Sequence, residues 1–337
     1  MSLSGGHLDI DRGQMDDQTI MNRFQPLWAD LRPEDTFAAK KPLLAHYTTI
    51  QTVEKILSSN EVWFSNPLFM NDIEEVRFGV LEANQIVLTS HRLVDACKTE
   101  QRALLFKNHF TECFNRFANE HVFNTYVFCL SNHDKEDDDG RLSMWRGYGA
   151  NGNGAAIVID TAKINVSEAT PLIIAQVSYD TREARLDWLR RTLSTFEVLL
   201  AAANIPDEKL HVAAHALFER IKIFALFTKH RGFIEEDEWR IVYLPDRDPH
   251  KKLHSMFHYL IGPRGVEPKL RFKISPVPGL TADDLSLDKI TDRIILGPSI
   301  SSPMARAAVL RMLDILEKPE LKPKLRVSSI PFRAVGS

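Results

Sequence analysis

The amino-acid sequence predicts an α+β fold: a mixed, largely antiparallel sheet with long helical insertions that form a helical lobe. Short apolar runs typical of strands recur along the chain. Two long stretches with the helical spacing of apolar residues interrupt these runs, at about 72–120 and 182–230. Because the strands and helices do not alternate regularly, the pattern favours an α+β domain.

The composition is that of an ordinary globular protein. Of the 337 residues, 44% are hydrophobic and 26% are charged, which allows a sizeable core. The 42 lysines and arginines nearly balance the 45 aspartates and glutamates, so no bulk charge attracts nucleic acid or an anionic membrane. The apolar runs are far shorter than the ~20 residues that a membrane span requires. We therefore expect no membrane partner.

The N-terminus and the cysteines predict the compartment. The first residues lack the basic start and the apolar stretch of a secretion signal. The chain has three cysteines, an odd number: Cys97, Cys113 and Cys129. They are widely separated and lie among apolar residues, which favours reduced core thiols over disulfides. We expect a cytoplasmic protein.

The chain is predicted to have a short arm and one domain. Residues 1–40 are polar apart from one amphipathic patch, so we expect a partly disordered, loosely held arm with one short helix. Residues 41–335 are expected to form a single α+β domain that contains both helical insertions.

The domain is predicted to open with a strand, a helix and a second strand. The first strand covers residues 43–48, and Thr48 with Gln51 forms a capping-box pattern at the start of the helix. Asn60 suits the left-handed residue that ends the helix, and the second strand, at 62–65, stops before an Asn-Pro pair.

The later elements follow from the same patterns. Helices are expected at 182–203 and 207–229, and another is expected to begin at Ser302-Pro303, a favoured cap followed by a favoured first-turn residue. The further strands are predicted at 126–130, 155–159, 173–179, 239–244, 270–274 and 293–296.

The first candidate for a functional residue is His46. Strand alternation places it on the face opposite Tyr47, near the end of the strand, where an imidazole can reach a ligand. A core histidine bonded to a backbone group is an equally good interpretation.

The second candidate is the acidic run that ends in Glu238-Trp239-Arg240. Strand alternation would set Glu236, Glu238 and Arg240 on one face. Burying paired carboxylates beside an arginine is costly and shifts their pKa values, which is typical of functional sites. A structural ion pair explains the spacing equally well.

Two other segments carry weaker signals. In the polar cluster at 69–75, Asp72 is a good helix cap, and the following acidic residues suit the positive end of the helix dipole. The glycine-rich segment 142–154 matches the letters of a dinucleotide fingerprint, but the strand and helix around it are in reversed order. A glycine-rich turn is therefore expected there, although Trp145, Arg146 and Tyr148 could stack on a nucleotide.

The histidine pairs and the acidic loop are not expected to bind a metal. His211 and His215 are four residues apart, as are three histidines between 250 and 258, but the glutamate of a zinc protease motif is missing. The acidic loop 134–139 lacks the alternating ligands and the glycine of a calcium loop, so we expect it to be solvated.

Six short motifs recur in order along the chain: His46-Tyr47-Thr48, the strand and turn from Trp63 to Pro67, Asn71-Asp72 with Glu75, Met144-Trp145 with Tyr148-Gly149, Glu236-x-Glu238-Trp239-Arg240, and Ile295-Leu296-Gly297-Pro298. Taken together, they resemble domain-of-unknown-function family 2971, over about residues 43–300. That family is bacterial and cytoplasmic, and its members often look like parts of phage-defence or toxin-type systems.

A more distant similarity is to the ADP-ribosyltransferase superfamily, which has an early strand histidine and a late strand glutamate in this order. The resemblance implies that NAD is the substrate and that Glu238, Glu236 and His46 are catalytic. His46 would contact the ribose, Glu238 would stabilise the cationic sugar as nicotinamide leaves, and Glu236 would activate the acceptor. The implied NAD-binding residues are His46, Tyr47, Ser65, Trp145, Tyr148 and Arg240.

The middle strand departs from that superfamily. It has Phe64-Ser65-Asn66 where a serine-threonine-serine pattern is usual, and a second ring-stacking tyrosine has no clear place.

The sequence therefore supports three hypotheses for the function. The first is an NAD-dependent ADP-ribosyltransferase or NAD glycohydrolase, acting as a defence effector on a protein or nucleic-acid acceptor. The second is a metal-dependent nuclease, in which Asp72, Glu75, Glu236 and Glu238 would hold magnesium. The third is a non-catalytic sensor or interaction module with a polar core.

Overall fold

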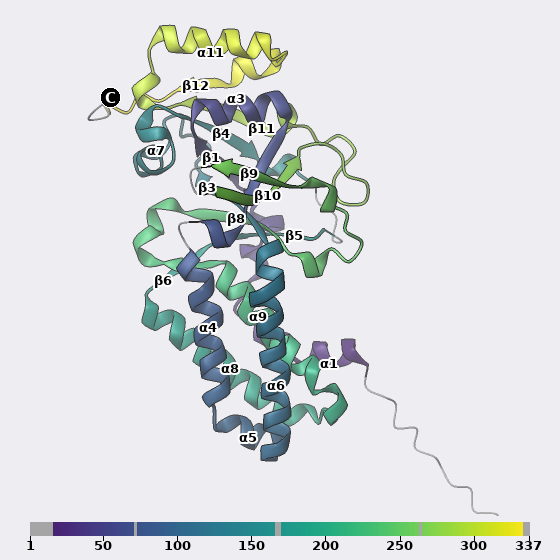
Figure 1. Ribbon diagram of the computed structural model, residues 1–337. Helices are drawn as coiled ribbons and strands as arrows, with labels where there is room; N and C mark the ends of the chain where they lie inside the picture. The colour runs from purple at the N-terminus through teal and green to yellow at the C-terminus, as the bar shows by residue number, and fades with distance from the viewer. Residues whose placement is uncertain (1–15, 71–72, 166–169, 263–264, 333–337) are drawn as a thin grey trace, which may run out of the picture.

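The computed structural model describes residues 16–70, 73–165, 170–262 and 265–332. A sheet with covering helices forms one part of the molecule and a bundle of long helices forms the other (Figure 1). This architecture confirms the α+β class, the mixed sheet and the helical lobe.

The main sheet has ten strands in the order β12-β11-β4-β1-β3-β2-β10-β9, with β8 paired to β3 and β5 paired to β8. All of these pairs are antiparallel except β11 with β12. The strands are β1 Leu43–Thr48, β2 Glu61–Ser65, β3 Tyr126–His133, β4 Ala155–Asp160, β5 Leu172–Gln176, β8 Glu238–Tyr243, β9 Phe257–Gly262, β10 Gly265–Lys273, β11 Thr291–Leu296 and β12 Leu325–Val327.

The sheet opens along one edge of β3. Strand β1 pairs with β3 from Leu43 to Ala45, whereas from His46 onward its described partner is β4. Strand β2 reaches the same edge of β3 further along, where Ser65 lies opposite Val127. Residues 128–130 of β3 therefore lie between two diverging strands, which leaves room for a cavity in the sheet.

The helical lobe packs around aromatic residues. Its helices are α4 Ile73–Thr89, α5 Arg92–Cys97, α6 Glu100–Arg116, α8 Arg182–Ala203 and α9 Leu210–Leu226. Phe106 and Phe196 are fully buried between them, with ring centroids 5.2 Å apart. The insertion expected at about 72–120 as two long helices is three helices in the described residues, because α5 separates the long pair.

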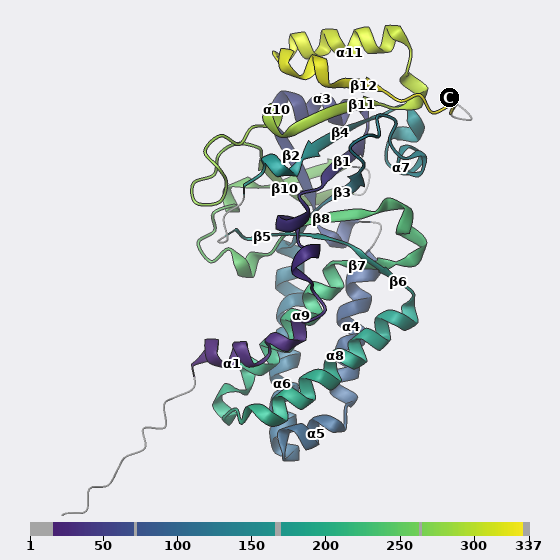
Figure 2. The same ribbon diagram turned by 180° about the vertical axis from the view of Figure 1, so that it is seen from behind.

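The N-terminal segment is packed on this lobe. Helix α1 Asp17–Arg23 lies against α9 (Figure 2). Phe24 follows it and stacks on Phe196, with ring centroids 5.0 Å apart. The expected short helix is present, but the expectation of a loose arm is wrong for residues 16–28, which enter the lobe core. Residues 1–15 lie outside the described residues.

Several local predictions are confirmed and several need correction. Asn60 is left-handed, with φ 55°, and α11 Pro303–Ile315 begins after Ser302. The cap of α3 Ile50–Ser59 is Thr49 rather than Thr48, because the Thr49 hydroxyl accepts from the Thr52 amide.

Other elements differ from the predicted ones or were not predicted at all. The apolar run at 173–179 is two strands, β5 and β6 Ser178–Asp180, and β6 pairs in parallel with β7 Thr228–His230. Strands β7, β9 and β12 were missed, and β7 takes the end of the helix expected at 207–229. A short helix, α7 Leu142–Gly147, occupies part of the expected glycine-rich turn. Among the described residues, no helix has the length and apolar character needed to cross a bilayer.

A buried amide holds β2 beside β3. Asn66 directly follows β2 and has none of its surface exposed. Its amide nitrogen donates to the carbonyls of Val122 and Thr125, just before β3, at 2.9 and 3.0 Å. Its side-chain oxygen accepts from the Leu68 amide at 2.9 Å. These bonds fix the end of β2, and with it Ser65, at the opening in the sheet.

We predict that Asn66→Ala lowers the free energy of unfolding by about 2 kcal/mol or more, since buried carbonyls would lose their donor. Chemical denaturation measures the loss. The matched control is Asn124→Ala, whose side chain donates one exposed bond to Glu120 and should change stability by less than about 0.5 kcal/mol. Equal effects of the two variants would contradict this role for Asn66.

Candidate functional site

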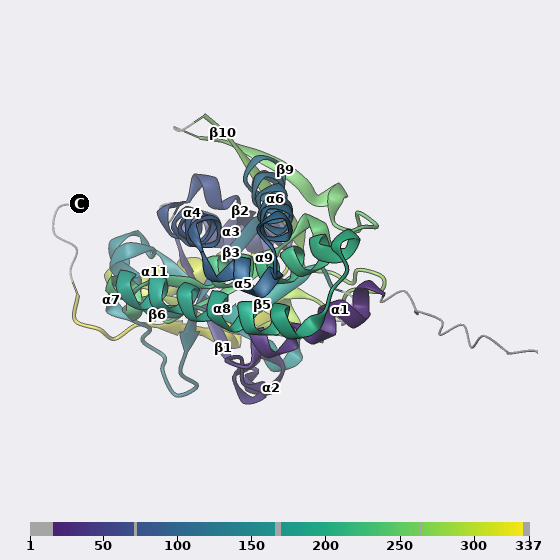
Figure 3. The ribbon, with the colours of Figure 1, turned by 90° about the horizontal axis from the view of Figure 1, so that it is seen from below.

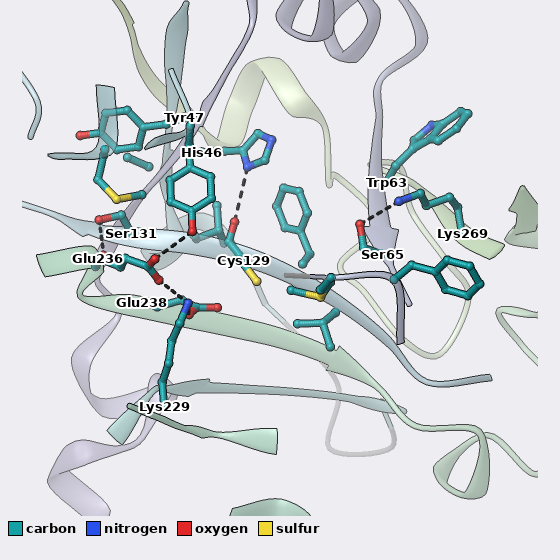
Figure 4. A pocket seen from close by; sticks show the side chains of 18 residues that line it. His46, Tyr47, Trp63, Ser65, Cys129, Ser131, Lys229, Glu236, Glu238 and Lys269 are labelled. Carbon is teal, nitrogen blue, oxygen red and sulfur yellow. Dashed lines mark hydrogen bonds and ion pairs between the residues drawn. The ribbon is translucent and has the colours of Figure 1, made fainter. Parts of the chain in front are cut away.

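A cavity of about 280 Å³ lies where β1 and β2 diverge from β3. Figure 4 shows carboxylates at one end, His46 and Cys129 in the middle, and Ser65 with Lys269 at the other end. Of the residues predicted to form a site, the cavity is lined by His46, Tyr47, Ser65, Tyr148, Glu236 and Glu238.

Glu238 lies in a buried ion network at the acidic end. It opens β8, and Arg240, two residues on, donates from Nε to Glu238 Oε1 at 2.7 Å. The ammonium of Lys229, on β7, donates to Glu238 Oε2 at 3.3 Å and to Glu236 Oε2 at 2.5 Å. Two cations therefore balance two carboxylates in a region where Glu238, Arg240 and Lys229 are each less than 5% exposed.

Glu236 belongs to this network, but its backbone conformation differs from the predicted one. Strand alternation was expected to align Glu236 with Glu238, but Glu236 ends a 3-10 helix, Arg231–Glu236, and Asp237 adopts a left-handed conformation with φ 41°. The bend at Asp237 brings the two carboxylates to one ammonium. The Tyr148 hydroxyl donates to Glu236 Oε1 at 2.8 Å.

Asp237 is held firmly in that conformation. Its carboxylate accepts from Arg141 at 2.7 Å and from Gln176 at 2.9 Å. Burial alone would raise the pKa of Asp237, but these hydrogen bonds and the positive charge of Arg141 lower it below its ordinary value. An ionised Asp237 therefore fixes the turn that positions its two acidic neighbours.

Glu238 is ionised at neutral pH. Burial disfavours the charged carboxylate, but Arg240 and Lys229 outweigh that cost and lower its pKa to about 2. Glu238 is therefore an anion fixed in position at the cavity wall.

His46 is neutral at the same pH. Burial lowers its pKa to about 4, despite a long hydrogen bond, 3.4 Å, between Nδ1 and the Cys129 carbonyl. A carbonyl can only accept, so Nδ1 carries the proton and Nε2 carries the lone pair. His46 thus offers an acceptor rather than a cation.

Cys129 connects the two predicted catalytic residues. Its carbonyl accepts from His46, and its thiol hydrogen-bonds to the Glu238 carboxylate. Burial raises the pKa of Cys129 well above its ordinary value, and the charge of Glu238 raises it further, so the thiol stays protonated. His46 and Glu238, far apart in the sequence, meet at one residue of β3.

Two predicted ligand contacts are not supported by where the side chains lie. Trp145 is fully buried behind Tyr47, edge-on at 4.8 Å, and its indole donates to the Asp139 carbonyl. Arg240 is 3% exposed and faces Glu238 and the Leu226 carbonyl. Trp145 supports the Tyr47 ring, and Arg240 orients Glu238. Neither lines the cavity.

Tyr47 does line the cavity. Its hydroxyl accepts from the Arg141 amide at 3.0 Å, and burial raises the pKa of the phenol to about 12. The ring is thereby fixed between Trp145 and the cavity.

Sequence reasoning missed the two lysines of the site. Lys229 lies in a three-residue strand between a helix and a turn, so no local periodicity marks it. Lys269 had a weak signal, since Lys269, Arg271 and Lys273 alternate along β10, but the predicted strand began one residue later. Both lysines reach the site only through tertiary pairing.

Of the four residues proposed for a magnesium site, the structure describes the side chains of two, Glu236 and Glu238. Asp72 lies outside the described residues, as does the side chain of Glu75. Among the residues that are described, no three His, Cys, Asp or Glu side chains are arranged to hold a metal ion.

Part of the chain matches a protein family. A family model described as a protein of unknown function (DUF2971) matches residues 144–241. This confirms the expected resemblance for part of the chain, the part that carries Tyr148, Lys229, Glu236 and Glu238, and not for the segment with His46. No curated protein and no solved structure matches the chain.

We predict that Glu238→Gln lowers the free energy of unfolding at pH 7 by about 3 kcal/mol, because two buried cations would lose an anion. The folded pKa of Glu238, about 2, lies below its ordinary 4.5, so its stabilisation is complete above pH 4.5 and is lost as the pH falls toward 2. Denaturation at pH 7 and at pH 3.5 measures the free energy of unfolding of wild type and variant. The difference between the two proteins should be about 1 kcal/mol smaller at pH 3.5 than at pH 7.

The control for this prediction is Glu235→Gln, an exposed neighbour, which should change stability by less than about 0.5 kcal/mol. If the difference in the free energy of unfolding between wild type and Glu238→Gln stays constant with pH, Glu238 is not held ionised by its partners.

A second prediction concerns His46. Nitrogen-15 NMR should show its imidazole neutral at pH 7, with Nδ1 protonated, and His46→Gln identifies the signal. Because burial sets the folded pKa near 4, below the ordinary 6.5, stability should fall as the pH drops through this window, and less so in His46→Gln. An imidazolium at pH 7 would contradict the assignment.

Proposed function

We propose that the protein is an NAD-consuming enzyme of the ADP-ribosyltransferase type, acting in the cytoplasm. The observation that carries the proposal is that an ionised glutamate, Glu238, and a neutral histidine, His46, line one cavity and meet at Cys129. The proposed place in a phage-defence or toxin-type system rests on the resemblance to family 2971 alone.

The proposed reaction breaks the bond between the ribose C1′ and the nicotinamide nitrogen. The bonding electron pair leaves with nicotinamide, so positive charge develops on the sugar, and Glu238 lies fixed as the anion that stabilises it. The lone pair on His46 Nε2 accepts a ribose hydroxyl and orients the sugar. Water or an acceptor group then forms a bond to C1′.

Glu236 is the group proposed to take the proton of the incoming nucleophile. Its carboxylate is at the cavity wall and is less buried than Glu238, with 13% of its side chain exposed against 5%. Lys229 and Tyr148 hold it in place, so it needs no rearrangement before it acts.

One observation favours a second function, a binding module without catalysis. Both oxygens of Glu238 already accept hydrogen bonds from buried cations, which reduces the field that it exerts on a sugar cation. The geometry of Glu238 is preorganised, whereas its net charge is largely balanced. Glu238 can promote the reaction only if its fixed position stabilises the sugar cation by more than the neighbouring cations weaken that stabilisation.

The test is release of nicotinamide from NAD, with and without protein or nucleic-acid acceptors. We predict that Glu238→Gln reduces the rate by about 100-fold or more, as for loss of an electrostatic transition-state contact. His46→Ala should raise KM more than it lowers kcat. Glu235→Gln, an exposed neighbouring carboxylate outside this cavity, is the matched control and should retain the wild-type rate.

The other outcomes distinguish the alternatives. Binding of NAD without release of nicotinamide would favour the binding module. Magnesium-dependent degradation of RNA or DNA, abolished by Glu236→Gln, would favour the nuclease. Full activity of Glu238→Gln would rule out the proposed role of this residue.

A further inference from the structure

The end of the cavity opposite the carboxylates is formed by neighbouring strands. Ser65 lies opposite Lys269 and Trp63 lies opposite Arg271 in the pairing of β2 with β10. Since side chains alternate along each strand, these four residues share one face of the sheet. Ser65, Trp63 and Lys269 line the cavity, and Arg271 continues the row outward. We name these four residues the β2–β10 strip.

Lys269 is the cation of this strip nearest the cavity. It is 8% exposed, and its ammonium donates to the Ser65 hydroxyl at 3.0 Å, as Figure 4 shows. Glu267 forms an ion pair with it at 3.2 Å. An ammonium has three donors, so Lys269 can contact both of these groups and a further anion.

The outer part of the strip combines an aromatic ring with a second cation. Trp63 is 37% exposed, the guanidinium of Arg271 lies 5.4 Å from its ring centroid, and His258 stacks on it at 5.5 Å. Two bonds from Arg271 to Glu61, at 2.9 and 3.0 Å, hold the guanidinium in that position. Strands β9 and β10 extend this face to one side of the molecule (Figure 3).

The size of the cavity decides what the strip would bind. About 280 Å³ is near the lower limit for small-molecule sites, so the cavity can enclose the nicotinamide ribose but not a whole dinucleotide. With the sugar beside Glu238 and His46, the remainder of the ligand would leave the cavity past Ser65 and Lys269. A diphosphate is the part of a dinucleotide that requires a cation there.

We propose that the β2–β10 strip is the subsite for the diphosphate of a dinucleotide, with Lys269 and Ser65 as its ligands. This inference rests on the proposed function, because it assumes that the reacting end of the ligand lies beside Glu238. A nucleic-acid backbone suits the strip less well, since a long polyanion requires many cations along its length, whereas the strip offers two, each beside a carboxylate, Glu61 or Glu267.

The probe for this subsite is ADP, which carries the diphosphate without the nicotinamide ribose. Calorimetry should show Lys269→Gln binding ADP about 10- to 100-fold more weakly than wild type, the loss expected for one charge-assisted hydrogen bond. Ser65→Ala removes the second ligand without changing charge and should weaken ADP binding about fivefold. Adenosine, which has no phosphate, should bind both variants as it binds wild type.

The matched control is Lys273→Gln. Lys273 lies on the same strand and the same face but is exposed and does not line the cavity, so ADP binding should be unchanged. If Lys269→Gln proves unstable in thermal unfolding, Ser65→Ala alone decides the outcome.

The results separate this inference from the proposed function. Weaker ADP binding in both variants, without release of nicotinamide from NAD by wild type, would support the subsite and contradict the enzyme. Release of nicotinamide with an unchanged KM for NAD in both variants would support the enzyme and overturn the subsite. No binding of ADP to wild type would also overturn the subsite.

Discussion

The buried ion network around Glu238 is the interaction on which the site depends. Arg240 contacts Glu238 within β8 and also donates to the Leu226 carbonyl at the end of α9, at 2.7 Å. Lys229 comes from the segment that follows α9 and bonds to both carboxylates. Burying four charges is costly, and only mutual pairing offsets that cost. The network therefore fixes the helical lobe, the sheet and the acidic end of the cavity relative to one another.

The features of the fold and the site that could be predicted from the sequence are those determined by residues close together in the chain. Hydrophobic alternation located the strands that carry His46 and Glu238, and Asn60 marked the end of a helix through its tolerance of positive φ. The acidic residues before Trp239 were recognised as unusual because an apolar strand rarely begins with several carboxylates. Each of these signals lies within a few residues of the feature it predicts.

The parts that were missed depend on contacts between distant segments. Nothing near Lys229 in the sequence reveals that it meets two carboxylates, and the left-handed turn at Asp237 is fixed by Arg141 and Gln176 from other elements. Strand periodicity also cannot show that β1 separates from β3 after Ala45, since β1 stays paired with β4 along its whole length and keeps the same pattern of side chains. Trp145 was expected at a ligand, but the close packing of α7 on Tyr47 buries it.

The connection of the helical lobe to the network has a consequence for protein engineering. Helices α8 and α9 are one of the two insertions that form the lobe, and a chain could be shortened by replacing them with a connection long enough to join β6 to its parallel neighbour β7. Such a shortened chain would keep Glu238 and His46, yet Arg240 would lose the carbonyl of Leu226 and Lys229 would lose the helix that positions it. A minimal version of this site must therefore include the end of α9, and grafting the cavity onto another sheet would require an equivalent buried acceptor.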